Sequence, residues 1–109
     1  MRRIEISSEA RIEIKEIAAF SHENFGSVGV ARYAKLIQEA IRVVARSPES
    51  RSARTIAPGL RIFHLKHLGG SQGVKTPRHI IVYRFSADRL EVLHVFHDAM
   101  DLPARLSVL

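Results

Sequence analysis

The spacing of apolar residues changes partway along the chain, and this change is the strongest constraint on its fold. Between residues 8 and 47, apolar side chains recur every three or four positions, which is the period of an amphipathic helix. After residue 60, runs rich in Ile, Val, Leu and Phe lie between turn residues, which is typical of strands. A helical part followed by several strands predicts an α+β fold.

The helical part is expected to form two helices joined by a tight link. Ser7 or Ser8 can cap the first helix, which should end near Phe25. Gly26 is suited to a helix C-terminal cap, and Pro48 stops the second helix because its ring cannot continue the helical backbone. The sequence therefore predicts a helix hairpin.

Strands are expected at both ends of this hairpin. Residues 2–6 alternate apolar and charged side chains and predict a short N-terminal strand. Residues 47–59 are rich in Ser, Pro and Arg, have no periodicity and predict a loop. Three further strands are expected at residues 60–68, 78–85 and 90–96. The short turn at residues 86–88 makes the last two an antiparallel pair.

One domain accounts for residues 1–109, because a chain of this length buries a real core but has no room for a second domain. We expect an N-terminal strand and a two-helix hairpin packed on a twisted, mainly antiparallel sheet. The expected core residues are Ile14, Ile17, Ile37, Ile41, Val44, Ile62, Ile81, Val92 and Val95. Residues 98–109 are expected to form a short helical or extended tail that packs on the domain or on a partner.

Several classes of chemistry are disfavoured by composition. The chain has no Cys, which removes disulfides and thiol nucleophiles, and no stretch approaches the length that crosses a bilayer. Paired carboxylates, a phosphate-binding glycine loop and a Ser/His/Asp order are not found. His94 and His97 lie three apart on an expected strand, so they point to opposite faces and suit one metal poorly. We expect a cytoplasmic protein without membrane anchor, metal or cofactor.

A long basic segment is the main functional signal. From Ser50 to Ala87 the chain has seven Lys or Arg, three His and no Asp or Glu, and the net charge of the whole chain is +6. A surface of one sign attracts phosphate backbones or acidic protein segments. The residues expected to contact such partners are Arg61, Lys66, Arg78, Arg84, His94 and His97.

An enzymatic alternative uses some of the same residues. His97 could act as a base, Arg84 and Arg61 could clamp a phosphate, and Tyr83 could supply a phenol, as in a metal-free ribonuclease. A histidine that only bonds a backbone carbonyl at a strand end is the simpler explanation of His97. A third hypothesis is a plain nucleic-acid-binding module, although the few aromatic residues disfavour base stacking.

The order of elements resembles the RelE/ParE superfamily of bacterial type II toxins, and the ParE branch most closely. The matching segments are Ser8–Ala10, Ala31–Tyr33, Ser47–Glu49, Pro58–Arg61, Ile81–Arg84 and Leu90–Asp101. The last segment has the family's closing strand, a histidine, and an aspartate after a small residue. The resemblance covers nearly the whole chain.

The resemblance implies a toxin that is neutralised by a cognate ParD-like antitoxin with an acidic C-terminal segment, in a hetero-oligomer. ParE-like members inhibit DNA gyrase, whereas RelE-like members are ribosome-dependent mRNA endoribonucleases. Such nucleases commonly use His or Tyr near the C-terminus, and residues 98–109 offer Arg105 but no His, Tyr or Lys. This departure from the nuclease pattern favours gyrase as the target. The segment at residues 66–77 is longer than in ParE relatives, which bears on the choice of target or antitoxin.

Overall fold

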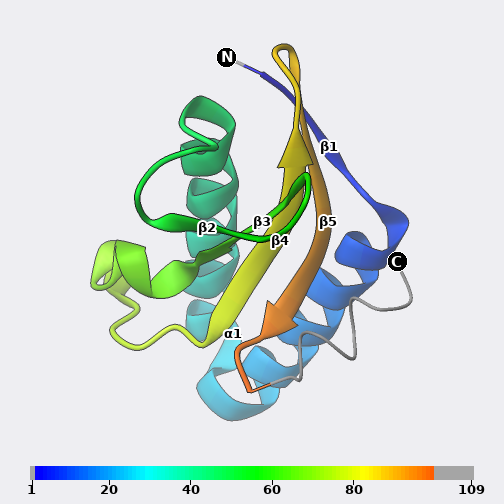
Figure 1. The fold of residues 1–109 in the computed structure, drawn as a ribbon. Helices are drawn as coiled ribbons and strands as arrows, with labels where there is room; N and C mark the ends of the chain where they lie inside the picture. The colour runs from blue at the N-terminus through cyan, green and yellow to red at the C-terminus, as the bar shows by residue number, and fades with distance from the viewer. Residues whose placement is uncertain (1, 100–109) are drawn as a thin grey trace.

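The computed structural model describes residues 2–99, which form two layers, one helical and one a five-stranded sheet (Figure 1). In chain order the elements are β1 (Arg3–Ile6), α1 (Ser8–Arg46), β2 (Ala53–Ala57), β3 (Leu60–His64), the 3-10 helices η1 (Leu65–Leu68) and η2 (Ser71–Gly73), β4 (His79–Phe85) and β5 (Arg89–His97). Both arms of α1 lie on one face of the sheet (Figure 1). The predicted α+β class is confirmed.

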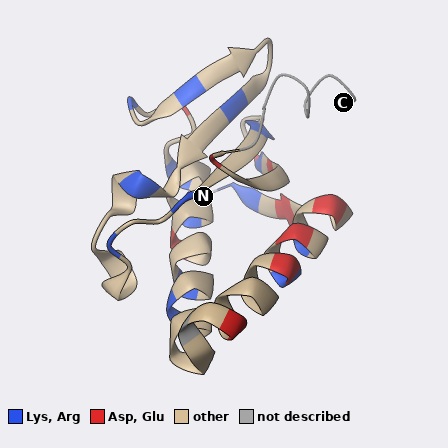
Figure 2. Ribbon diagram, turned by 90° about the horizontal axis from the view of Figure 1, so that it is seen from below, with Lys and Arg blue, Asp and Glu red and all other residues tan. Residues whose placement is uncertain are grey.

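The helix α1 is a hairpin because its backbone turns at Gly26. This residue has φ 73° and ψ −175°, a positive φ that residues with a Cβ rarely adopt. The arms, residues 8–25 and 27–46, diverge from the turn as a V (Figure 2). No helix within residues 2–99 combines the length and apolar character needed to cross a membrane.

Both outer ends of the hairpin follow the sequence signals. Ser7 is the N-cap, because its hydroxyl accepts a hydrogen bond from the Ala10 N–H at 3.0 Å. The second arm ends at Arg46, and the Ser47 N–H bonds the Val43 carbonyl before Pro48 stops the helix. Of the two serines that could cap the first helix, the structure selects Ser7.

The sheet is mainly antiparallel, as expected, with strand order β1-β5-β4-β3-β2. The pairs β2–β3, β3–β4 and β4–β5 are antiparallel, whereas β1 runs parallel to β5. Strand β1 covers only the first half of β5, from Arg89 to Val92. Beyond it, the Ser7 hydroxyl donates to the Leu93 carbonyl at 2.7 Å, and Glu13 accepts from the Val95 N–H at 3.0 Å. Side chains near the start of α1 therefore replace the missing strand.

Two expected boundaries were wrong. Residues 47–59 are not all loop, because Ala53–Ala57 form the edge strand β2. An edge strand needs few apolar residues, and Arg54 and Thr55 are exposed, so β2 lacks the apolar run that identifies other strands. Strand β3 also ends at His64, whose side chain accepts a bond from the Lys66 N–H and thereby starts the 3-10 helix η1.

The main core lies between α1 and the sheet. Six of the expected core residues are buried there, and two more pack against it: Ile37, Ile41, Val44, Ile81, Val92 and Val95, with Ile14 and Ile17 at the margin. Ile62 is the exception, because it is buried on the opposite face with Ile80, Val82 and Phe96. Its neighbour Phe63 takes the position facing the helices. The sequence does not reveal which of two adjacent apolar residues faces inward.

Replacing Ile41 with Asp should abolish the native fold. The Ile41 side chain is 5% exposed, and burying an unpaired carboxylate costs several kcal/mol, comparable with the whole stability of about 5–15 kcal/mol of a small domain. Circular dichroism during heating should show no cooperative transition. The control is Ile12→Asp in the same helix, where the side chain is 56% exposed. A cooperative, native-like melt of Ile41→Asp would contradict this packing.

Candidate functional site

The two faces of the sheet carry different side chains. Residues paired across neighbouring strands point to the same face, and Arg54 pairs with Ile62, which pairs with Val82. These three lie on the face away from α1, which is called the outer face below. Phe63 and Tyr83 belong to the core between the sheet and α1. Basic and apolar residues are therefore combined on the outer face.

Two of the predicted site residues lie on the helix side and bond the protein's own backbone. Tyr83 is fully buried, and its hydroxyl donates to the Pro48 carbonyl. Arg61 donates from Nε to the same carbonyl at 2.8 Å, and from Nη1 to Thr55 Oγ1 at 2.6 Å. Burial raises the pKa of Tyr83. Both side chains hold the segment after α1 against the sheet.

Arg84 lies on the outer face, because it follows Tyr83 directly in β4. Its Nε bonds the Glu91 carboxylate across the strand pair, and that bond lowers the pKa of Glu91. His97 lies at the far end of β5, opposite His79. The structure does not bring together the four residues of the ribonuclease alternative.

His94 is held between a ring and a carboxylate. Its ring stacks on Phe96 at 4.5 Å between centroids, and its Nδ1 lies 3.1 Å from a Glu13 carboxylate oxygen. Only 13% of the side chain is exposed. Little of His94 is available to a partner.

Asp98 gathers two of the basic residues at the end of β5. The Arg78 Nε donates to both carboxylate oxygens at 3.0 and 2.9 Å, and His64 Nε2 lies 2.9 Å from one of them. Because His64 Nδ1 already accepts from the Lys66 N–H, the proton of a neutral His64 is on Nε2. The Arg78 bond, with help from His64, lowers the pKa of Asp98 to about 2. Both ring nitrogens of His64 are engaged.

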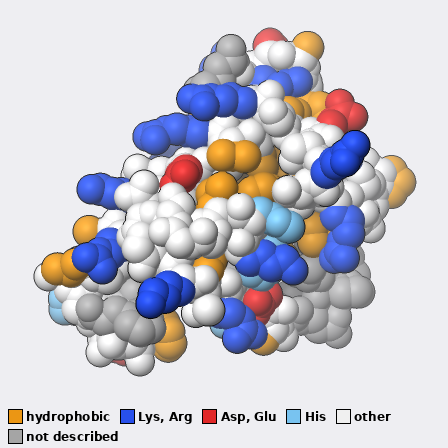
Figure 3. Space-filling view, turned by 90° about the vertical axis from the view of Figure 1, so that its left-hand side faces the viewer, with side chains coloured by type: hydrophobic (Ala, Val, Ile, Leu, Met, Phe, Trp, Pro, Cys, Tyr) orange, Lys and Arg blue, Asp and Glu red, His pale blue; other side chains and the backbone are white. Residues whose placement is uncertain are grey.

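Lys66 lies at a cavity of about 420 Å³ on the outer face, called the outer pocket below. The residues that define its chemistry are Arg51, Arg54, Lys66 and His67, which surround the apolar Ile62 and Ile80. Figure 3 views the molecule from the side of β2 and shows hydrophobic side chains with Lys, Arg and His around them. The basic run in the sequence predicted the charge, whereas the pocket itself depends on the strand β2 that the sequence did not reveal.

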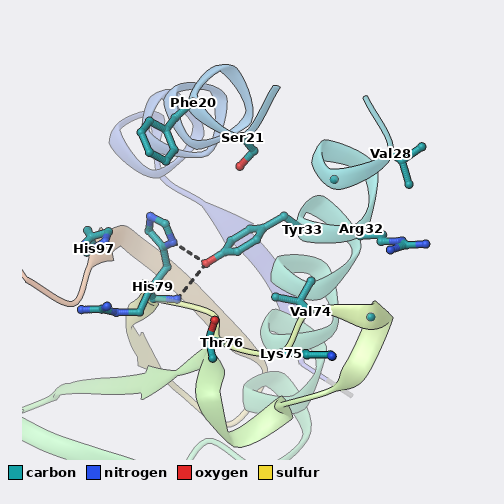
Figure 4. Close-up of a pocket in the computed structure, with 13 residues that line it drawn as sticks. Phe20, Ser21, Val28, Arg32, Tyr33, Val74, Lys75, Thr76, His79 and His97 are labelled. Atoms are coloured by element: carbon teal, nitrogen blue, oxygen red, sulfur yellow. Dashed lines mark hydrogen bonds between the residues drawn. The ribbon is translucent and has the colours of Figure 1, made fainter. Parts of the chain in front are cut away.

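A second cavity of about 460 Å³, called the hairpin pocket below, lies between α1, the loop before β4 and the ends of the strands (Figure 4). Phe20 and Val28 border it from the two arms and are 62% and 61% exposed. Its basic and imidazole side chains are Arg32, Lys75, Arg78, His79 and His97. None of the described residues that line it is Asp or Glu. The signal in the sequence was Phe20 and Val28, two apolar residues on either side of Gly26 that are not part of the core.

Tyr33 and His79 form a fixed pair in the wall of the hairpin pocket. The Tyr33 hydroxyl lies 2.6 Å from His79 Nδ1 and accepts from the Arg78 N–H at 3.3 Å (Figure 4). The phenolic proton is thus directed at Nδ1, which fits a neutral imidazole with its proton on Nε2. Burial, and then the neighbouring His97 ring, lower the pKa of His79 to about 4. His79 is uncharged at neutral pH.

His97, whose ring lies against that of His79, is partly exposed. Its side chain is 43% exposed, and Nδ1 accepts a bond from the Ala99 N–H at 3.0 Å. A backbone bond at a strand end is the simpler of the two explanations that the sequence allowed for this residue. Within residues 2–99, no three His, Asp or Glu side chains come together in a way that could hold a metal ion.

This two-layer fold is found in a known toxin–antitoxin protein. The chain is similar to a chain of the chromosomal ParDE toxin–antitoxin system from P. aeruginosa, with a TM-score of 0.69 and 12% identity, over 89% of this chain and 96% of that one. The family model for the ParE toxin of the type II toxin–antitoxin system parDE matches residues 4–102. None of the curated proteins compared matches the chain. The chain belongs to the ParE toxin family, which implies an antitoxin as partner.

The depressed pKa of His79 predicts that the fold loses stability in mild acid. The unfolded residue titrates near its ordinary value of 6.5 and the folded one near 4, so stability is complete above 6.5 and is lost as pH falls between these values. Asp98 adds a separate loss between 3.8 and about 2. Urea unfolding at pH 7 and pH 5 should show a smaller difference for His79→Gln than for the parent. His22→Gln, at an exposed site on α1, is the control, and equal pH dependence in all three proteins would refute the assignment.

Proposed function

We propose that this ParE-family toxin arrests growth by inhibiting DNA gyrase, and that a ParD-like antitoxin neutralises it through an acidic C-terminal segment. Family membership supports the toxin role. The observation that carries the antitoxin part is the hairpin pocket, which combines apolar and basic side chains and has no carboxylate among its described lining residues. Complementary charge at such a surface speeds association and selects the partner.

The hairpin pocket fits a segment that is both acidic and apolar. Phe20 and Val28 offer apolar area on either side of the opening. Lys75 and Arg32 are exposed and form none of the ion pairs within residues 2–99. A disordered acidic segment can fold onto a surface of this kind and cover it.

The predicted binding residues divide between two surfaces. Arg78 and His97 line the hairpin pocket, so we assign them to the antitoxin. Lys66 lies at the outer pocket, which remains for the target. Arg84 and His94 lie on the outer face, where each is paired with an acidic side chain. Arg61 lies on the helix side of the sheet and supports this surface by bonding the Pro48 carbonyl.

Gyrase inhibition is tested by supercoiling of relaxed plasmid in the presence of the purified protein. We expect less supercoiled product and, after detergent and protease, trapped cleaved plasmid. Ile41→Asp, which should not fold, is the inactive control. Normal supercoiling at a large excess of folded protein would contradict the gyrase assignment.

The alternative is a RelE-like ribosome-dependent mRNA endoribonuclease. It would require His97, Tyr83, Arg84 and Arg61 to meet one substrate, and the burial of Tyr83 argues against this. A variant with Tyr83→Phe and His97→Ala separates the two functions in the same growth assay. Undiminished growth arrest removes the nuclease. Loss of arrest in a variant whose melting curve remains native supports it.

Charge reversal in the hairpin pocket should weaken the antitoxin complex. Replacing Arg32 and Lys75 with Glu should raise the Kd for the antitoxin's acidic segment roughly 100-fold, about 2.7 kcal/mol, because attraction becomes repulsion. Isothermal titration calorimetry measures this directly. The matched control is Lys15→Glu with Arg42→Glu, two exposed residues of α1 outside the pocket. Equal weakening in both double variants would show that only net charge matters.

A further inference from the structure

The proposed function leaves the outer pocket to the target but uses only its positive charge, and the pocket also has apolar and aromatic side chains. It is a concave site of about 420 Å³, which is within the range of sites that hold one small ligand. Basic side chains stand around an apolar base made by Ile62 and Ile80. The strand register explains this arrangement, because Arg54 pairs with Ile62 and His64 pairs with Ile80.

The cations at this pocket are available to a ligand. Arg51, Arg54 and Lys66 are exposed and take part in none of the ion pairs within residues 2–99. Asp98 is the one carboxylate among the described residues that line the pocket, and Arg78 and His64 already bond it. The net field in the pocket is positive and attracts an anion.

The base of the pocket is suited to a flat, uncharged group. His67 lines the pocket, and its ring leans on the buried Phe63 at 5.5 Å between centroids. Burial, with the nearby Lys66 and His64, lowers the pKa of His67, so the ring is neutral at pH 7. A neutral imidazole beside Ile62 and Ile80 can stack against a nucleobase, although a carboxylate gains nothing from it.

We propose that the outer pocket binds single-stranded DNA, with an unpaired base against Ile62, Ile80 and His67 and with phosphates on Arg51, Arg54 and Lys66. An acidic protein segment would meet the cations with its carboxylates and cover Ile62 and Ile80 with its apolar side chains, as we propose for the hairpin pocket, but only an aromatic group stacks on the His67 ring. A paired duplex keeps its bases stacked inside and cannot fill a concave site. The choice of DNA over RNA rests on the proposed gyrase target, which acts on DNA, and the matching RNA strand is therefore one of the competitors in the test.

Binding is measured by the fluorescence anisotropy of a labelled twelve-nucleotide single strand mixed with the full chain. Three phosphate contacts predict a slope of log K against log salt of about −2. Replacing Arg51, Arg54 and Lys66 with Ala should weaken binding by about tenfold or more and flatten this slope. The matched control replaces Lys15, Lys35 and Arg42 with Ala, and these three residues are exposed on α1. This control removes the same charge and should change the affinity less than about threefold.

A second variant tests the base contact separately from charge. His67→Ala should weaken binding of the normal strand by about five- to tenfold and leave binding of an abasic strand of equal length unchanged. Equal losses on both strands would remove the base from the proposal. These assays contain neither gyrase nor antitoxin, so their failure leaves the proposed function standing, and failure of gyrase inhibition leaves them standing.

Three competition results and one comparison of variants would overturn the proposal. The competition results are displacement of the strand by polyglutamate of equal charge as efficiently as by unlabelled DNA, tighter binding of a duplex than of the single strand, and binding of the matching RNA more than about tenfold tighter than the DNA. The variant result is an equal loss of affinity in the two triple variants. The first would identify an acidic-protein surface, and the last an effect of net charge alone. Preference for single-stranded DNA over all three competitors supports the proposal.

Discussion

The carbonyl oxygen of Pro48 joins the two layers of this protein. It accepts hydrogen bonds from the hydroxyl of Tyr83, at the centre of the sheet, and from Nε of Arg61 in the neighbouring strand. Leaving a buried polar group unpaired costs about 1–3 kcal/mol, so the chain leaving α1 is held at this position. The strand β2 starts from there and places Arg54 at the edge of the outer face. The outer pocket therefore depends on a contact made on the other side of the sheet.

The two pockets meet at one ion pair. Arg78 lines the hairpin pocket and Asp98 lines the outer pocket, and the two side chains bond each other at the end of β5. This pair removes the one negative charge that the outer pocket would otherwise contain among its described residues. The remaining cations fall into two groups, one at each pocket, so the proposed antitoxin and the proposed target need not share side chains.

Much of the fold was predictable because its signals are local. Gly26, Ser7 and Pro48 act through their own backbone or side chain, and the helix hairpin follows from them. The edge strand β2 was missed because its position comes from pairing with β3 rather than from its own apolar pattern. The chemistry of the site was harder to foresee. Tyr83 and Arg84 are adjacent in sequence, but alternation along β4 sends one into the core and the other to the outer face, and the tail at residues 100–109 lies outside the described residues.

The parallel pairing of β1 with β5 places the first strand of residues 2–99 beside the last strand of that range. The Ser7 hydroxyl reaches the carbonyl of Leu93, a residue 86 positions further along. During synthesis the helix hairpin can form early, but the edge that holds β1 does not exist until β5 has been made. The sheet of a growing chain is therefore incomplete, and neither pocket has all its walls, until β5 and Asp98 have left the ribosome.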